Sequence, residues 1–132
     1  MTAAREWVGT PYRHRASTPR AGCDCLGLVR GVWRSLYGGE PEAVPNYAAD
    51  WRRSGDELRA AAERWLIRAA GPARAGQVVL FRLGRAARHC GILVEPGRFV
   101  HAQEGLGVIE ANLNEAWSAR IAGLYDFPGV TD

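Results

Sequence analysis

Residues 24–37 have the sequence DCLGLVRGVWRSLY, which predicts a largely buried helix. Its apolar side chains recur at the spacing of a single helical face: Cys25, Leu28, Val29, Val32, Trp33 and Leu36. Asp24 suits the N-cap of this helix, and the Gly38-Gly39 pair ends it. Gly27 and Gly31 lie one turn apart on the same side, where we expect them to let another main chain approach closely.

Two further helices and a loop are expected around this segment. A short helix over Ala3–Val8 precedes a polar, basic loop from Tyr12 to Ala21. Ser54 and Glu57 have the spacing of a capping box, which predicts a third helix that runs to Ala70.

The second half of the chain is typical of strands. Gln77–Leu83 contains a continuous apolar run and predicts a central strand. The other expected elements are strands at His89–Val94, Arg98–Ala102, Val108–Ala111 and Ile121–Phe127, with a short helical turn at Asn114–Trp117. Helices followed by an antiparallel sheet indicate an α+β fold rather than an alternating α/β fold. At 132 residues we expect one domain, residues 1–132.

Composition excludes several classes of protein. Hydrophobic residues make up 47% and charged residues 23%, which is the balance of a globular chain rather than a disordered one. A net charge of +3 is too weak to indicate a nucleic-acid partner. No apolar run approaches the roughly 18 residues of a membrane span, and residues 1–8 lack the layout of a signal peptide. We therefore expect synthesis in the cytoplasm without a signal peptide, and neither nucleic acid nor membrane as a partner.

The three cysteines are expected to be free thiols, because an odd, small number argues against a disulfide scaffold. Cys25 lies in the first turn of the predicted helix, where unpaired N–H groups and a partial positive charge stabilise a thiolate. Cys25 is thus a candidate nucleophile, although a cysteine on an apolar stripe is more often a small core residue. Cys90 is interpreted as a core residue, and Cys23 has no assignable role.

Two histidines on neighbouring strands could serve such a nucleophile. A two-residue turn at Pro96-Gly97 would put His101 opposite Ile92, and His89 and His101 would then face opposite sides of the sheet. A turn with an odd number of residues, or a bulge, would instead put His101 opposite Gly91, on the same side as His89. In that register one histidine could act as the base and the other could orient it. Each could equally be a satisfied, half-buried residue.

His14, which lies among arginines, is interpreted as a solvated loop residue. A zinc site built from Cys23, Cys25, His89, Cys90 and His101 is disfavoured, because Cys-x-Cys is tighter than usual and adjacent strand residues point apart. No metal and no cofactor are expected.

Four segments, in this order and spacing, resemble the NlpC-type family of bacterial cell-wall cysteine peptidases within the papain-like superfamily. They are Gly9-Thr10-Pro11-Tyr12, Asp24-Cys25-Leu26-Gly27-Leu28, His89-Cys90-Gly91-Ile92 and Phe99-Val100-His101-Ala102. The resemblance implies helices, one with the catalytic cysteine at its start, packed on an antiparallel sheet that carries the histidines. It implies Cys25 as nucleophile, His89 as general base and His101 as the orienting third residue.

By the same resemblance, Tyr12 and Asp24 would contact substrate, and the reaction would hydrolyse an amide of the peptidoglycan stem peptide. The typical bond joins γ-D-glutamate to a diamino acid. Leu26 departs from the family, which often has serine there, and Cys90 stands where an aliphatic residue is common.

With a single expected domain, the chain resembles the short peptidases encoded among the tail genes of bacteriophages and gene transfer agents. This implies a subunit of the tail tip or baseplate that is virion-associated and opens the cell wall for DNA passage. Three alternatives stay open: a structural baseplate subunit with little activity, an amidase or acyltransferase with the same triad, and a zinc-binding module.

Overall fold

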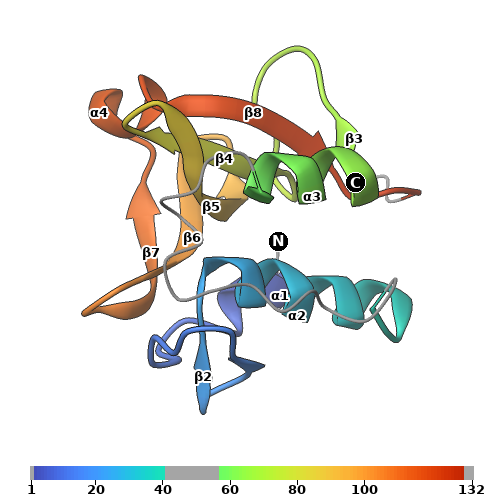
Figure 1. Cartoon of the computed structure of the whole chain (residues 1–132), viewed down its shortest axis with the longest axis vertical. Coiled ribbons are helices and arrows are strands. Elements are labelled where there is room, and N and C mark those ends of the chain that lie inside the picture. Colours follow the sequence, from blue (N-terminus) through green and yellow to red (C-terminus); the bar gives the residue numbers. More distant parts are fainter. Residues whose placement is uncertain (1, 41–56, 130–132) are drawn as a thin grey trace.

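A six-stranded antiparallel sheet formed by the second half of the chain has most of the helices on one face and a short one on the other (Figure 1). The computed structural model describes residues 2–40 and 57–129. The helices are α1 (Thr2–Arg5), α2 (Cys25–Tyr37), α3 (Glu57–Trp65) and α4 (Glu115–Ser118). The described elements confirm the predicted α+β class.

The sheet has the strand order β3-β8-β4-β5-β6-β7, and every neighbouring pair is antiparallel. Its strands are β3 (Ile67–Arg68), β4 (Val78–Leu83), β5 (Ala86–Glu95), β6 (Arg98–Gln103), β7 (Gly107–Asn112) and β8 (Ile121–Asp126). Two short strands, β1 (Ser17–Thr18) and β2 (Gly22–Cys23), pair separately. The central position of β4 agrees with its continuous apolar run.

Helix α2 forms where its capping residues predict. The Asp24 carboxylate accepts a hydrogen bond of 2.7 Å from the main-chain N–H of Gly27. At the other end, Gly38 takes the left-handed conformation with φ of 81°, and its N–H donates to the Arg34 carbonyl. Leu28 and Val32 are fully buried, so the apolar face of α2 packs on the sheet.

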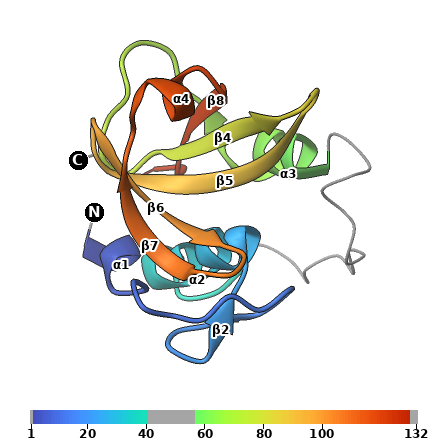
Figure 2. The ribbon, with the colours of Figure 1, turned by 90° about the vertical axis from the view of Figure 1, so that its left-hand side faces the viewer.

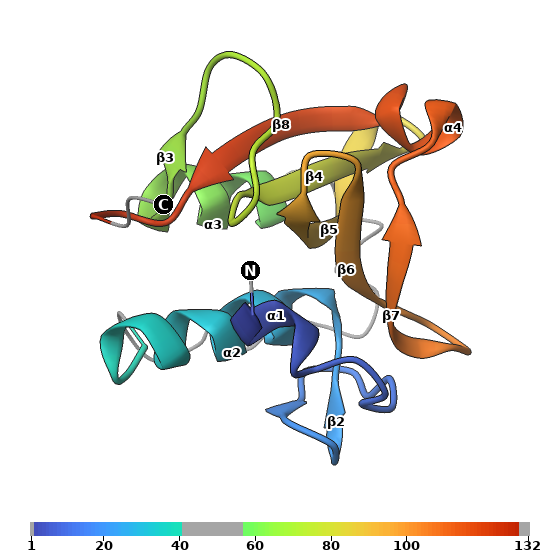
Figure 3. The same cartoon turned by 180° about the vertical axis from the view of Figure 1, so that it is seen from behind.

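The sheet separates two apolar clusters. Helices α2 and α3 cover one face with Leu28, Val32 and Leu58, above Ile92 and other strand residues. The opposite face holds a smaller cluster of Val79, Phe81, Leu93 and Phe99, against which Trp117 of α4 packs. Figure 2 shows α4 and α2 on opposite sides of β4 and β5. From behind, α1 lies beside α2 with β2 below them (Figure 3).

Two helix boundaries differ from the sequence-based prediction. Helix α1 ends at Arg5 and continues as turns instead of reaching Val8. Helix α3 ends at Trp65, not Ala70, because the chain then pairs with β8 as strand β3. Pairing with a distant strand supplies these main-chain groups with hydrogen-bond partners that a longer helix would otherwise provide. The capping residue Ser54 lies outside the described residues.

The expected polar loop at Tyr12–Ala21 contains strand β1, and it runs against the start of α2. A Cβ on Gly27 would lie 1.9 Å from the Ala16 carbonyl oxygen, so the predicted close approach of a main chain is confirmed there. At Gly31 the prediction is wrong: the neighbour is the Trp7 side chain, 2.0 Å from a Cβ at that position. An indole ring therefore fills that space.

Candidate active site

Cys25 is the first residue of α2, which positions its side chain at the helix N-terminus and against the sheet. The residue is only 1% exposed. At this point the helix has main-chain N–H groups without partners inside the helix, and these favour a negative charge. The local structure is therefore suited to a thiolate.

His89 and His101 face the same side of the sheet because a bulge interrupts the β5–β6 hairpin. Ile92 pairs with Val100 and Leu93 with Phe99, whereas Glu95 pairs with Arg98, so the register shifts between Leu93 and Glu95. Of the two registers that the sequence left open, the bulged one is therefore the one that forms.

The two imidazoles are in direct contact as a result. His89 Nε2 and His101 Nδ1 are 2.8 Å apart, and the rings meet edge to face. Because Nε2 of His89 is engaged in this way, its Nδ1 is the nitrogen available to a thiol. Gly91 makes room for the pair, since a Cβ there would lie 2.8 Å from the Val100 oxygen and 3.1 Å from His101 Cβ.

The surroundings of Cys25 favour its ionised form. Hydrogen bonds from Cys90 and His89, together with the charge of His89, lower the pKa of Cys25 to about 5, against the opposing effects of burial and of the Asp24 charge. A thiol with this pKa is mostly a thiolate at neutral pH. His89 therefore favours the ionised form of Cys25.

His101 is held neutral. Burial and the neighbouring charge of His89 lower the pKa of His101 to about 3. A neutral His101 with its proton on Nε2 can accept a hydrogen bond at Nδ1 from a protonated His89. This arrangement fixes the orientation of the His89 ring.

Trp117 is a neighbour of the histidines that the sequence did not indicate. Its ring centroid lies 5.8 Å from that of His89 and 5.3 Å from that of His101. It also packs on Phe81 and Phe99. Trp117 therefore covers the histidine pair on the side away from α2.

Asp24 directly precedes Cys25, and Tyr12 pairs with the segment that leads into it. The Asp24 carboxylate is fully buried and accepts hydrogen bonds from the N–H groups of Gly27 and Arg15. The main chain of Tyr12 forms a bridge with Cys23, two residues before Cys25. Both residues thus border the start of α2.

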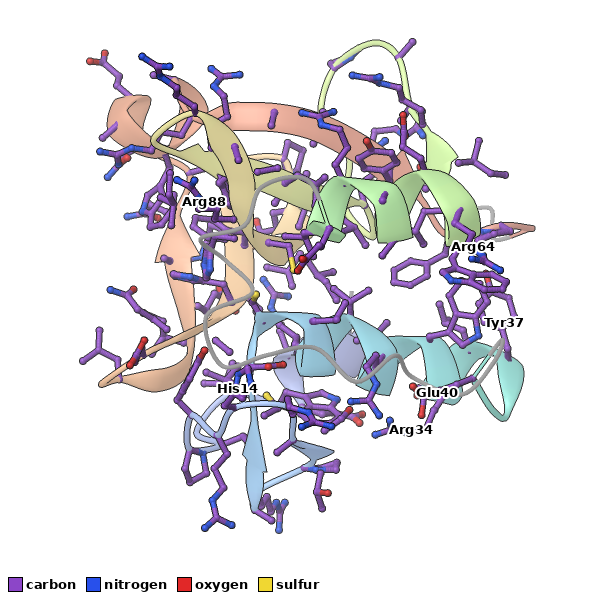
Figure 4. All side chains as sticks on the ribbon, viewed as in Figure 1. His14, Arg34, Tyr37, Glu40, Arg64 and Arg88 are labelled. Carbon is purple, nitrogen blue, oxygen red and sulfur yellow. The ribbon has the colours of Figure 1, made fainter. Side chains whose placement is uncertain are left out.

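His14 is not simply a solvated loop residue, as its arginine-rich surroundings suggested. Its side chain is 31% exposed, and its Nδ1 lies 3.8 Å from an Asp24 oxygen. Figure 4 shows His14 near the N-terminal end of α2, while Tyr37 lies at the far end. No local pattern indicated this contact, because it depends on how the loop folds back on the helix.

The other two cysteines differ in their surroundings. Burial raises the pKa of Cys23 to about 12, so this thiol stays protonated. Cys90 is buried as expected, but its Sγ also lies 3.3 Å from the Cys25 carbonyl oxygen, to which it donates. Cys90 and Leu26, the two departures from the family pattern, both line an apolar pocket between α2, α3 and the sheet.

Within residues 2–40 and 57–129, no cluster of three or more histidine, cysteine or carboxylate side chains has a geometry that could hold a metal ion. In the same part of the chain, no helix is both long and apolar enough to cross a membrane.

The sequence matches known proteins over nearly its whole length. The murein DD-endopeptidase MepS/murein LD-carboxypeptidase of Escherichia coli K12 is 33% identical over 121 residues, which are 91% of this chain and 57% of that protein. The gamma-DL-glutamyl hydrolase of Bacillus subtilis 168 is 30% identical over 131 residues, 97% of this chain and 29% of that protein. The chain thus spans little more than half of the first relative and less than a third of the second.

Solved structures agree with the fold. The NlpC/p60 domain of the peptidoglycan hydrolase SagA superposes with a TM-score of 0.63 at 22% identity, over 96% of this chain and 94% of that one. A Staphylococcus aureus protein of the NLP/P60 family, described as similar to lipoprotein, gives a TM-score of 0.63 at 23% identity, over 96% of this chain and 39% of that one. The family model of NlpC/P60 matches residues 9–124, and the chain therefore belongs to the NlpC/P60 family.

Proposed function

We propose that this chain is a cysteine endopeptidase that cleaves the peptidoglycan stem peptide, with Cys25 as nucleophile, His89 as general base and His101 as the orienting residue. The observation that carries the proposal is the contact of 2.8 Å between His89 Nε2 and His101 Nδ1, together with the stabilisation of the ionised form of Cys25 by His89. Covalent catalysis by a thiol requires a nucleophile, a base and a residue that orients the base, each within hydrogen-bonding reach of the next.

The reaction follows from this arrangement. The Cys25 proton passes to Nδ1 of His89, and the thiolate attacks the amide carbonyl carbon. Main-chain N–H groups at the start of α2 stabilise the oxyanion that forms. His89 then gives its proton to the leaving amine, the C–N bond breaks, and a thioester remains on Cys25. A water molecule that His89 deprotonates hydrolyses the thioester, which releases the acid and regenerates the thiol.

The names of the relatives support peptidoglycan or γ-glutamyl peptides as the substrate class. One relative is named for murein, and the other for a gamma-DL-glutamyl bond. The proposed scissile bond joins γ-D-glutamate to a diamino acid of the stem peptide. Tyr12 and Asp24 are the proposed substrate-binding residues, since both border the helix start that carries the nucleophile.

The proposal includes delivery to the cell wall on the tail tip or baseplate of a phage-like particle, with other tail proteins as partners. Its support is the resemblance to short tail-encoded peptidases. Co-sedimentation of the chain with intact particles, detected by mass spectrometry, tests this part. Recovery of the chain only outside particles would contradict it.

A second candidate function is a structural subunit that keeps the fold but cleaves slowly. The burial of Cys25, which is 1% exposed, favours this alternative because a substrate carbonyl must reach the sulfur. Reaction of Cys25 with iodoacetamide distinguishes the two. Alkylation below pH 7 supports an accessible thiolate, whereas an inert Cys25 supports the structural subunit.

The decisive experiment is mass spectrometry of defined muropeptides incubated with the purified protein. Wild type is expected to cleave between γ-D-glutamate and the diamino acid, while Cys25→Ala and His89→Ala are expected to be inactive and folded. Cys23→Ala removes another buried thiol and is the matched control that should retain activity. Addition of an amine acceptor identifies an acyltransferase through a new amide product. Cleavage by Cys25→Ala at the wild-type rate would contradict the proposal.

A further inference from the structure

The two histidines of the candidate site lie among aromatic rings. The centroids of the Phe81 and Trp117 rings lie 6.1 and 5.8 Å from that of His89. Those of the Phe99 and Trp117 rings lie 4.6 and 5.3 Å from that of His101. Trp117 thus packs on both imidazoles, beside the 2.8 Å contact that joins them.

Trp117 separates the histidines from solvent. Phe81 and Phe99 are fully buried, whereas Trp117 is half-buried, so the indole is the outer ring of the cluster. Beneath it, His89 is 5% exposed and His101 is 1% exposed. Trp117 belongs to α4, which lies on the opposite side of β4 and β5 from α2 (Figure 2). The indole therefore covers the pair on the side away from the helix that carries the nucleophile.

Hydrogen bonds fix the place of Trp117. Its main-chain N–H donates to the Asn114 side-chain oxygen at 2.9 Å, which caps α4. On β4, the Arg82 main-chain N–H donates to the Arg120 carbonyl oxygen at 2.6 Å, and its guanidinium donates to the Ala119 carbonyl oxygen at 3.1 Å. The four-residue helix is thus capped at its start and tied to β4 just after its end, so the indole stays in place over the histidines.

Dry surroundings strengthen the contact between His89 Nε2 and His101 Nδ1. A hydrogen bond in a medium of low dielectric constant is stronger than one in water, where solvent competes for the acceptor. Without the indole, a water molecule would donate to Nδ1 of His101 in place of His89. The His89 imidazole would then turn about its Cβ–Cγ bond, because no fixed partner would hold its Nε2 atom.

We infer that Trp117 is a positioning residue that excludes water from the contact between His89 and His101 and so holds the His89 ring in the orientation that catalysis needs. The inference rests on the proposed function, because it assigns Trp117 a part in orienting the proposed base. Trp117 acts through the two imidazoles and touches neither the substrate nor the proton that moves.

The first test is the steady-state kinetics of muropeptide cleavage. In Trp117→Ala we expect kcat to fall about tenfold and KM to stay within about twofold, because the base is misoriented while the substrate site is intact. Trp117→Phe keeps a flat apolar ring against the pair and should restore most of kcat. Trp33→Ala is the matched control: it removes a half-buried indole that packs on Tyr37 and Phe127, and it should show the wild-type kcat. A wild-type kcat in Trp117→Ala would overturn the inference.

A double substitution separates positioning from a merely structural role. In His101→Ala the protected contact is already gone, so the addition of Trp117→Ala should lower kcat by less than about twofold. A substitution that only weakens the fold would cause the same loss in both backgrounds. A further loss of about tenfold in the double variant would therefore overturn the inference.

A measurement on the unaltered protein keeps the inference testable even if Trp117→Ala does not fold. In proton NMR spectra at neutral pH, the imidazole N–H of the contact should give a downfield resonance, since a proton shielded from water exchanges slowly. Comparison with His101→Ala, which lacks the contact, assigns this resonance. Exchange with water too fast for the resonance to be seen in wild type would overturn the inference.

These results separate the two proposals. A wild-type protein that shows the protected resonance but cleaves no muropeptide contradicts the proposed function, while the shielding of the histidine contact by Trp117 is supported. Cleavage by wild type and by Trp117→Ala with equal kcat contradicts the role of Trp117 alone.

Discussion

At the scale of single residues, the role proposed for His101 is to orient the base without exchanging a proton with the substrate. Its Nδ1 lies 2.8 Å from His89 Nε2, and its pKa of about 3 keeps it neutral as an acceptor. We therefore expect His101→Ala to lower kcat/KM by roughly 10- to 100-fold, and His89→Ala by more than about 1000-fold, because only His89 moves the reacting proton. Rates of muropeptide cleavage measure both. Equal losses in the two variants would contradict the division of roles.

The sequence names the candidate residues, whose roles stay predictions, but it does not indicate which side chains surround them. Cys25 was indicated by the helix start, which is a local pattern. The contact between His89 and His101 depended on one bulge, and the sequence left its presence open. Trp117 and the thiol contact of Cys90 depend on how separate elements pack, and no spacing along the chain encodes that.

At the scale of elements, the β5–β6 hairpin positions the histidine pair through the close approach at Gly91. A methyl group there would lie 2.8 Å from the Val100 carbonyl oxygen and 3.0 Å from Phe99 Cδ2. We expect Gly91→Ala to lower the free energy of unfolding by about 1–3 kcal/mol and to reduce activity further by displacing His101.

Gly97→Ala is the matched control for this prediction, since a Cβ at Gly97, in the turn of the same hairpin, has no neighbour within 4 Å. Urea denaturation and muropeptide cleavage measure the two effects. Equal stability of the two variants would show that the hairpin can widen at Gly91 without cost.

The start of α2 depends on a similar approach at Gly27. Alanine has a higher helix propensity than glycine by about 1 kcal/mol, but its Cβ would lie 1.9 Å from the Ala16 carbonyl oxygen. The main chain cannot move aside like a flexible side chain, so we expect the clash to outweigh the gain in helix propensity. Gly27→Ala should lower the free energy of unfolding by about 3 kcal/mol or more. Gly39→Ala, with no neighbour within 4 Å of its Cβ, should change stability by less than about 0.5 kcal/mol. A Gly27→Ala protein as stable as wild type in urea would show that this loop is free to move.

Most elements of the fold were predictable because their signals are local. The N-cap and glycine stop of α2 and the apolar run of β4 each lie within a few residues. The predictions are wrong where pairing between distant segments of the chain determines the secondary structure. Strand β3 was taken as helix because only β8, more than fifty residues away, gives Ile67 and Arg68 their partners. The two-residue strands β1 and β2 are too short to show a period.

At the scale of the whole molecule, the neutral buried His101 links stability to pH. Its pKa is lowered from 6.5 to about 3 on folding, so between these values the unfolded chain binds a proton that the folded chain does not. Stability must therefore rise with pH across this window and be lost as the pH falls. Each unit of pKa difference corresponds to about 1.4 kcal/mol, and we expect a loss of roughly 1–2 kcal/mol on acidification from pH 6.5 to pH 5.

Comparison with His101→Asn isolates this contribution, because the variant keeps every other titrating group of the chain. Glu40 and Glu110 also have lowered pKa values. Burial opposes the change at Glu40, but hydrogen bonds and charge from Arg30 and Arg34 outweigh it. At Glu110, hydrogen bonds from Arg5 and Arg98 lower the pKa. The contributions of these two carboxylates to stability disappear only as the pH falls below about 4.5, the ordinary pKa of glutamate. Urea unfolding at several pH values between 5 and 6.5 should therefore show a shallower loss of stability in the variant. Parallel curves for the two proteins would mean that His101 takes up a proton in the folded state, which would also remove its role as the neutral acceptor for His89.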